Sequence, residues 1–114
     1  MPLPQAVKEM VEAKLSQYCE TRIPAHAKDQ VRLDYKIRGN FVTLFEERLV
    51  LRQIDTWVAI NIAQFRFDPQ AQTWRLFWAD RNSRWHEYYD MDSVKNIDQL
   101  LEEVDADPTG IFWG

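Results

Sequence analysis

The chain has 114 residues, of which 46% are hydrophobic and 28% are charged, and its formal net charge at pH 7 is −4. A chain of this length buries roughly two-thirds of its unfolded surface, so it can fold as one domain without disulfides or metals. The acidic balance argues against a non-specific duplex DNA binder, which needs a basic face, and no apolar run approaches the ~20 residues of a membrane span.

The expected location is the cytoplasm. The N-terminus, MPLPQAVKEM, has neither the basic region nor the apolar core of a secretory signal. Cys19 is the only cysteine, so no intramolecular disulfide can form, and a reducing compartment is compatible. We interpret Cys19 as a small buried side chain on a helix rather than a reactive thiol, because only Arg22 lies at helical spacing to activate it.

The N-terminal segment predicts a helix over residues 4–22, with Pro4 in its first turn and Pro24 just beyond its end. Its apolar residues recur at the three-and-four spacing of a helix that buries one face. They are Val7, Met10, Val11, Leu15, Tyr18 and Cys19.

From Val31 the apolar period changes to two, which predicts a half-buried strand. Gly39-Asn40 then predicts a two-residue type II′ turn into a strand that begins at Phe41. This turn fixes the register of the hairpin. The expected pairs are Ile37 with Val42, Tyr35 with Leu44, Lys36 with Thr43 and Asp34 with Phe45.

Residues 46–57 are the least informative stretch. Leu49-Val50-Leu51 could extend the strand or cover a sheet edge, and we interpret the stretch as a strand end plus a loop. After it, residues 59–89 predict a meander of strands. Its turns are Asp68-Pro69-Gln70-Ala71-Gln72 and Asp80-Arg81-Asn82-Ser83, where Asn82 can take a positive φ angle.

The side chains of the meander separate into two faces if Asp68 pairs with Thr73 and Asp80 pairs with Ser83. Trp78 then lies directly across from Trp85 on the face toward the helices. That face would carry most of the large rings: Ala63, Phe65, Phe67, Trp74, Leu76, Trp78, Trp85 and Tyr89, together with Glu87.

The other face of the meander would hold the candidate site. Arg66 would lie opposite Arg75, and this like-charge pair destabilises the sheet unless a carboxylate or an anion lies between the two. The candidate ligand-binding residues on this face are Arg66, Arg75, Phe77, His86 and Tyr88.

The run SVKNIDQLLEEV predicts a second helix over residues 93–105, with Ser93 or Asp92 as its cap. Acidic residues crowd the negative end of the helix dipole, each unfavourable by about 0.3–1 kcal/mol if unpaired. We expect Arg66 or Arg75 to neutralise them. The tail at 108–114 has the apolar triplet Ile111-Phe112-Trp113 and is expected to dock.

These elements together predict one α+β domain over residues 1–114. It consists of an N-terminal helix, an antiparallel sheet of about five strands built from hairpins over about residues 31–90, and a C-terminal helix. The order of the sheet beyond adjacent hairpins does not follow from the sequence.

Parts of the chain resemble a known family. They are the Gly39-Asn40 hairpin leading into VTLFEER, the AQFRFDP…TWRLFWADRNSRWHEY meander and the closing LLEEVDADPTGIFWG. The resemblance is to small bacterial proteins grouped as a domain of unknown function, number 3024 in that series. It covers about residues 31–114, and the terminal DPTGIFWG is its most specific part. It implies a bacterial source and a complete single-domain protein, and no catalytic residues, because the family has no established activity.

The sequence predicts no catalytic, metal or cofactor site. His26 and His86 are the only histidines, no HxxxH or CxxC spacing occurs, and three glycines supply no phosphate-binding loop. The chemistry of the chain therefore indicates binding rather than catalysis.

Three functions stay open, and neither a ligand nor an oligomeric state follows from the sequence. The first is a non-enzymatic binding or regulatory module that meets another protein through the polar sheet face or the Trp113 end. The alternative is a binder of single-stranded nucleic acid or another anionic ligand, which the net charge does not support. In it, Phe77, Tyr88 and His86 would stack on bases, and Arg66, Arg75, Arg81 and Arg84 would meet phosphates. The third function, an enzyme that uses His86, has the least support. A structural explanation of the aromatic and arginine residues is also open, because the same pattern arises where a helix of the protein covers its own sheet.

Overall fold

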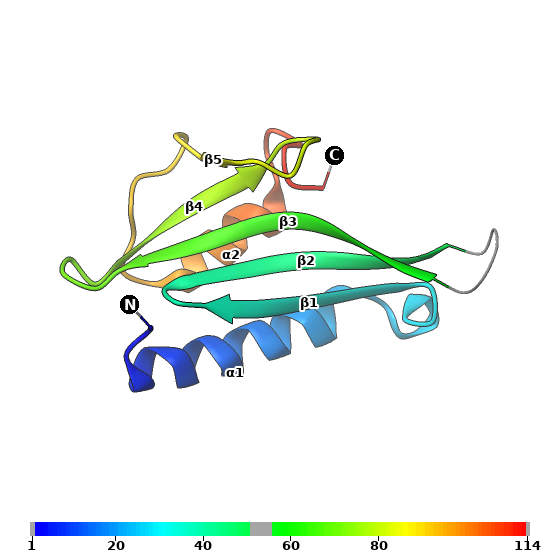
Figure 1. Cartoon of the computed structure of the whole chain (residues 1–114), viewed down its shortest axis with the longest axis horizontal. Helices are drawn as coiled ribbons and strands as arrows, with labels where there is room; N and C mark the ends of the chain where they lie inside the picture. Colours follow the sequence, from blue (N-terminus) through cyan, green and yellow to red (C-terminus); the bar gives the residue numbers. More distant parts are fainter. Residues whose placement is uncertain (1, 51–55, 114) are drawn as a thin grey trace.

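A computed structural model of the chain describes residues 2–50 and 56–113. Its strands form one antiparallel five-stranded sheet in the order β1-β2-β3-β4-β5, with helices before and after it (Figure 1). This confirms the predicted α+β class and the meander. The elements are α1 (Gln5–Arg22), the 3-10 helix η1 (Ala25–Ala27), β1 (Val31–Arg38), β2 (Phe41–Val50), β3 (Thr56–Asp68), β4 (Thr73–Ala79), β5 (Trp85–Glu87) and α2 (Ile97–Ala106).

Both helices lie on the same face of the sheet, α1 along the β1 margin and α2 behind β3 and β4 (Figure 1). An ion pair between Lys14 and Asp98 links the two helices. We call this side of the sheet the helix face and the opposite side the open face. Among the described elements, no helix or strand covers the open face. The core between helices and sheet includes Val11, Leu15, Val42, Leu44, Phe65, Trp74, Ile97, Leu100 and Val104.

The first hairpin has the predicted register. Ile37 faces Val42, and the other pairs that we expected are also present: Tyr35 with Leu44, Lys36 with Thr43, and Asp34 with Phe45. Gly39 has a φ of 60°, which suits the first position of a two-residue hairpin turn and costs a glycine little.

Residues 46–57 begin and end as strand. β2 continues to Val50, and β3 begins at Thr56, directly opposite it. Leu49 and Val50 therefore extend the strand, which is one of the two alternatives that the sequence left open. The rest of the expected loop falls on residues 51–55, which lie outside the described residues.

The two turns of the meander differ in outcome. Asp68 pairs with Thr73 as predicted, which places Arg66 directly opposite Arg75. The assumed pair of Asp80 with Ser83 is wrong, because Trp78 faces His86 rather than Trp85.

The physical reason is a wider second turn. The Asp80 carboxylate accepts hydrogen bonds from the backbone N–H groups of Asn82 (2.8 Å) and Arg84 (3.0 Å), and the Asp80 N–H donates to the Arg84 carbonyl at 2.9 Å. Ser83, not Asn82, takes the positive φ of 61°. Such a three-residue loop shifts β5 by one position, and this shift moves every β5 side chain to the other face.

The second helix begins four residues later than its predicted start at residue 93. Asn96 is its N-cap, with Oδ1 accepting a hydrogen bond from the Asp98 N–H at 2.9 Å, so neither Ser93 nor Asp92 caps the helix. Val94 instead forms a β-bridge with Trp74, and its N–H donates to the Trp74 carbonyl at 2.9 Å. This bridge holds residue 94 in extended backbone and delays the helix.

Substitution of the cap tests this helix start. We expect Asn96→Ala to lower the free energy of unfolding by about 1 kcal/mol, because it removes the acceptor for an otherwise unpaired helix N–H. Ser93→Ala should change it by much less, and Asn96→Asp should retain most of the stability. Urea denaturation of the variants checks this, and an equal loss in Ser93→Ala would contradict the assignment.

Candidate functional site

The open face carries basic and aromatic side chains in cross-strand rows. Because successive strand residues point to opposite faces, the observed registers decide which side chains share it. One row contains Arg38, Phe41, Arg66 and Arg75, and the next contains Lys36, Thr43, Gln64, Phe77 and Glu87.

Arg66 is at the centre of this face. The carbon of its guanidinium lies 4.4 Å from the ring centroid of Phe41 and 3.8 Å from that of Phe77. Its Nε donates a hydrogen bond to Gln64 Oε1 at 2.7 Å, and Gln64 Nε2 donates to Thr43 Oγ1 at 3.0 Å. Burial lowers the pKa of Arg66, but an arginine remains charged at neutral pH. The guanidinium is therefore a fixed positive charge held by rings and an amide.

The like-charge pair of Arg66 and Arg75 is relieved by a carboxylate of the protein itself. Arg75 Nη1 lies 2.6 Å from Glu87 Oε2. Glu87 was expected on the helix face, and the shift of β5 brings it to the open face instead. The carboxylate required by the sequence analysis is thus present, and Arg75 is largely neutralised.

His86 and Tyr88, which were expected on the open face, do not lie there. The His86 ring stacks on Trp78 with centroids 4.5 Å apart, and its Nε2 is 2.8 Å from Asp80 Oδ2. Tyr88 is only 4% exposed, and its hydroxyl donates to Glu103 Oε2 at 2.7 Å. Burial, reinforced by Glu103, raises the pKa of Tyr88 to about 12. Neither ring is available to a ligand on the open face.

Other side chains take their place. Trp85 pairs with Ala79 on the open face, the Arg32 guanidinium lies 3.8 Å from the Trp57 ring centroid, and Lys36 Nζ lies 5.6 Å from that of Phe45. The sequence shows that charged residues alternate along one side of β1. It does not show that aromatic rings of β2 and β3 lie close to these charges. A hollow of about 190 Å³ on this face is lined by Lys36, Arg38, Phe41, Thr43, Asn61, Gln64 and Trp85.

The open face holds cations that have no carboxylate partner. Within residues 2–50 and 56–113, no ion pair involves Lys36, Arg38 or Arg66. Yet the chain has 18 acidic and 14 basic residues, so acidic partners are in excess. The arrangement can therefore hold anionic groups.

A family model described as Domain of unknown function (DUF3024) matches residues 3–114. The chain belongs to the DUF3024 family. The match extends the resemblance seen from residue 31 onward to include α1. No curated protein and no solved structure matches the chain. The surface of this DUF3024 chain is therefore the main evidence for its function.

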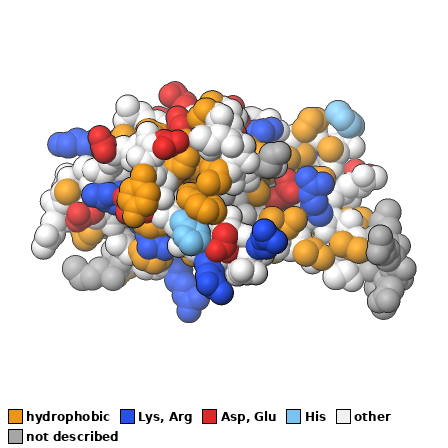
Figure 2. All heavy atoms as spheres, turned by 90° about the horizontal axis from the view of Figure 1, so that it is seen from above, with side chains coloured by type: hydrophobic (Ala, Val, Ile, Leu, Met, Phe, Trp, Pro, Cys, Tyr) orange, Lys and Arg blue, Asp and Glu red, His pale blue; other side chains and the backbone are white. Residues whose placement is uncertain are grey.

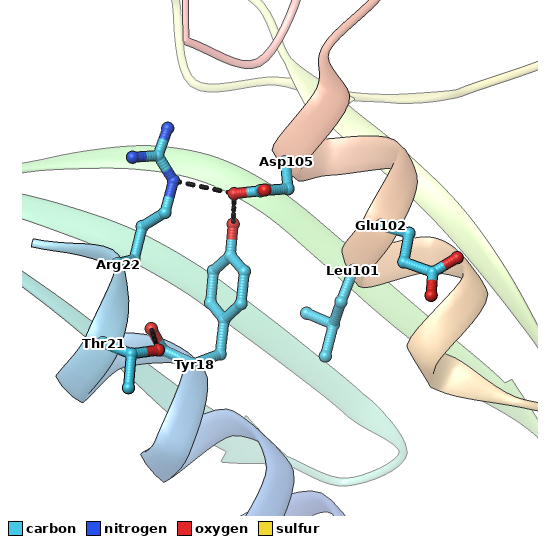
Figure 3. Close-up of a pocket in the computed structure, with 6 residues that line it drawn as sticks. All are labelled: Tyr18, Thr21, Arg22, Leu101, Glu102 and Asp105. Atoms are coloured by element: carbon cyan, nitrogen blue, oxygen red, sulfur yellow. Dashed lines mark hydrogen bonds and ion pairs between the residues drawn. The ribbon is translucent and has the colours of Figure 1, made fainter.

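Asp105, at the acidic end of α2, is neutralised by α1, and the expectation that Arg66 or Arg75 neutralises this end was wrong. Arg22 Nε lies 2.9 Å from Asp105 Oδ1, although its N–H is not aligned as a hydrogen bond, and the Tyr18 hydroxyl donates to the same oxygen at 3.4 Å. These residues border a groove of about 580 Å³ between the helices (Figure 3). The open-face arginines are on the wrong side of the sheet to reach it.

The Trp113 end is occupied within the protein. The Trp113 indole donates to the Val104 carbonyl at 2.8 Å, and the Arg22 guanidinium lies 4.7 Å from its ring centroid. The Asp107 carboxylate accepts hydrogen bonds from the backbone N–H groups of Phe112 and Trp113. The open face is thus the better candidate surface for a partner.

The metal-binding groups and the candidate reactive side chains of the described part of the chain bear on catalysis. It contains no group of three or more His, Cys, Asp or Glu side chains that could hold a metal ion. Burial raises the pKa of Cys19 to about 12, so this thiol carries almost no thiolate at neutral pH. His86 closes a turn with Asp80. None of the described helices is long and apolar enough to cross a membrane.

The Asp80 carboxylate should make stability depend on pH. The hydrogen bond with His86, followed by that from the Arg84 N–H, lowers its pKa from 3.8 to about 2. A depressed folded-state pKa stabilises the fold above the unfolded value, and this contribution is lost as the pH falls from about 4 to about 2.

We expect Asp80→Asn to show a smaller loss of unfolding free energy than the parent protein over this pH range. His86→Gln should fall between the two, because the backbone donors remain. Urea titrations at successive pH values measure the three slopes. Identical slopes for Asp80→Asn and the parent protein would show that the carboxylate is not held in this way.

Proposed function

We propose that this protein is a non-enzymatic binding module that holds an acidic partner protein on the open face of its sheet. The observation that carries the proposal is the set Lys36, Arg38 and Arg66, which form no ion pair with a carboxylate of the described residues although the chain is acidic. Arginine and aromatic side chains dominate the energy of protein interfaces. Their combination on an uncovered sheet face supports a role in binding. We also propose that the protein is located in the cytoplasm.

The charge pattern of the face favours a protein over a nucleic acid. Asp34, Glu47 and Glu87 are interspersed with the cations on the same side of the strands. These carboxylates would repel a continuous phosphate backbone, whereas an acidic protein carries separate carboxylates that can meet the cations and leave uncharged groups beside Asp34, Glu47 and Glu87. Arg66 is already held by Phe41 and Phe77 in the free protein, so its side chain loses little conformational entropy when a partner binds.

A defined peptide tests the proposal. In an NMR titration of the labelled protein with a synthetic peptide of alternating glutamate and phenylalanine, we expect shifts on β1 to β4 at the open face. The double variant Lys36→Glu, Arg38→Glu should weaken binding at least about tenfold, because like charges would then face each other.

The matched control is Lys8→Glu, Lys95→Glu, which makes the same charge change at exposed positions away from the open face. It should bind the peptide almost as the parent protein does. Equal weakening in both double variants, or shifts spread over the helix face, would contradict an open-face site.

A second candidate is a binder of single-stranded nucleic acid, and the hollow on the open face favours it. Trp85 lines this hollow together with the amide side chains of Asn61 and Gln64, and Gln64 accepts a hydrogen bond from Arg66 Nε. Ring surfaces next to hydrogen-bond donors are what recognition of unstacked bases requires.

Fluorescence anisotropy with a labelled oligothymidine tests this candidate. Phe77→Ala and Trp85→Ala should each weaken binding, since stacking on one base is worth about 1–3 kcal/mol, and the affinity should fall steeply with salt. Tyr89→Ala is the control, because Tyr89 is 83% exposed and follows β5 without joining it. Binding that is absent, or that does not depend on salt, would remove the candidate.

A further inference from the structure

β3 extends well beyond the strand that follows it. It pairs with β2 from Thr56 onward, but its pairing with β4 covers only Ala63 to Asp68. In Figure 1 the right-hand half of β3 continues past the arrowhead of β4. No strand of the described residues pairs with the β4 side of residues 57–62, so this part of β3 is an unpaired sheet edge.

This edge lacks the features that usually prevent strands from pairing. Residues 57–62 read WVAINI and carry no charge. Val58 is 44% exposed and Ile60 45%, and both lie on the helix face beyond the end of the helices. Hydrophobic side chains are visible at this narrow end of the molecule, next to the grey residues (Figure 2).

The outer strands of the same sheet are protected. β1 alternates Arg32, Asp34, Lys36 and Arg38, and β5 has only three residues. Natural sheets place charges on their edges or shorten them, because unpaired N–H and C=O groups otherwise recruit another strand. The β3 edge at residues 57–62 has neither form of protection.

There is room for another strand beside this edge. A groove of about 630 Å³ lies between the edge, the β4–β5 turn and the C-terminal tail, and its lining includes Ile60, Ile62, Asp80, Arg81, Ile111 and Trp113. A strand placed there would continue the line of β4 beyond Ala79.

We propose that two copies of this chain pair their β3 edges antiparallel, with Ala59 near the two-fold axis, to form one continuous sheet. This pairing sets Val58 of one copy against Ile60 of the other, so the exposed apolar side chains cover each other. The backbone groups of both edges become paired at the same time. This inference does not depend on the proposed function.

The charges beside the edge favour a second copy as the occupant. In each copy Arg48 lies opposite Val58 and Glu46 lies opposite Ile60 on the neighbouring strand, and these two residues form an ion pair within the chain. They therefore leave no unpaired charge beside the seam that would select a charged partner, whereas the same uncharged edge of a second copy matches it. The uncharged edge itself adds no repulsion between two chains that each carry a net charge of −4.

Sedimentation equilibrium over a range of concentrations tests the pairing. The parent protein should be a dimer, and Ile60→Lys should raise the dissociation constant by about a hundredfold or more, because two like charges would face the apolar seam. Tyr89→Lys is the matched control, since it replaces another exposed hydrophobic residue by the same cation and should remain a dimer. A parent protein that is monomeric at every concentration, or a dimer that persists in Ile60→Lys, would overturn the proposal.

A crosslinking experiment tests the register. Directly paired residues of antiparallel strands have Cα atoms about 4.5–5.5 Å apart, which is within disulfide range. In a Cys19→Ser background, Ala59→Cys should therefore form a covalent dimer under mild oxidation, and Arg81→Cys should not. Failure of Ala59→Cys to crosslink, or equal crosslinking of both variants, would overturn the pairing about Ala59.

Discussion

The structure depends on the unequal lengths of β3 and β4, which have 13 and 7 residues. At the point where β4 ends, the register between β2 and β3 shifts by one residue. Leu44 faces Ala63 but Phe45 faces Asn61, so Ile62 is an extra residue in β3. Such a bulge bends and twists a strand. The sheet is therefore wide over the helices, where the core lies, and narrow beyond them, where only β1, β2 and β3 continue. The groove, the unpaired edge and the exposed Val58 and Ile60 all belong to the narrow part.

The second organising feature is the separation of charge between the two faces of the sheet. On the helix face, Lys14 pairs with Asp98, Arg22 pairs with Asp105, and Tyr88 binds Glu103. The acidic end of α2, which opposes the helix dipole, is thereby stabilised by α1 and by a buried tyrosine. Because these carboxylates are held on the helix face, they are not available to the cations of the open face. Arg66 and Lys36 contact aromatic rings instead, and no carboxylate of residues 2–50 and 56–113 forms an ion pair with either.

The sequence predicts the fold well wherever a short turn decides the register. Gly39-Asn40 and Asp68-Pro69 have strong local preferences, and both hairpins that they close have the expected pairing. The second turn of the meander gave a weaker signal, because a side-chain bond from Asp80 and an unusual φ at Ser83 add one residue to the loop. Because of that single residue, the open face carries Trp85 and Glu87, and the predicted His86 and Tyr88 lie on the other face. Arg66, Arg75 and Phe77 lie on the open face, as the sequence predicts. The N-cap at Asn96 was missed for a related reason. The bridge of Val94 to Trp74 is a tertiary contact, and helical periodicity cannot reveal it.

The chemistry of the open face follows from how Arg66 is held. A carboxylate would fix the guanidinium but would also cancel its charge, so an incoming anion would have to displace it. Two rings and an amide oxygen fix the same group and leave its charge in place. Arg66 is partly buried, which removes part of the hydration of its guanidinium and lowers its pKa. An anion that contacts it therefore meets a positive charge that is oriented and partly desolvated. A paired sheet would bring a second such face alongside the first, because the open faces of both copies lie on the same side of one continuous sheet. The unpaired edge and the cationic face would then form one continuous surface across two copies of the chain.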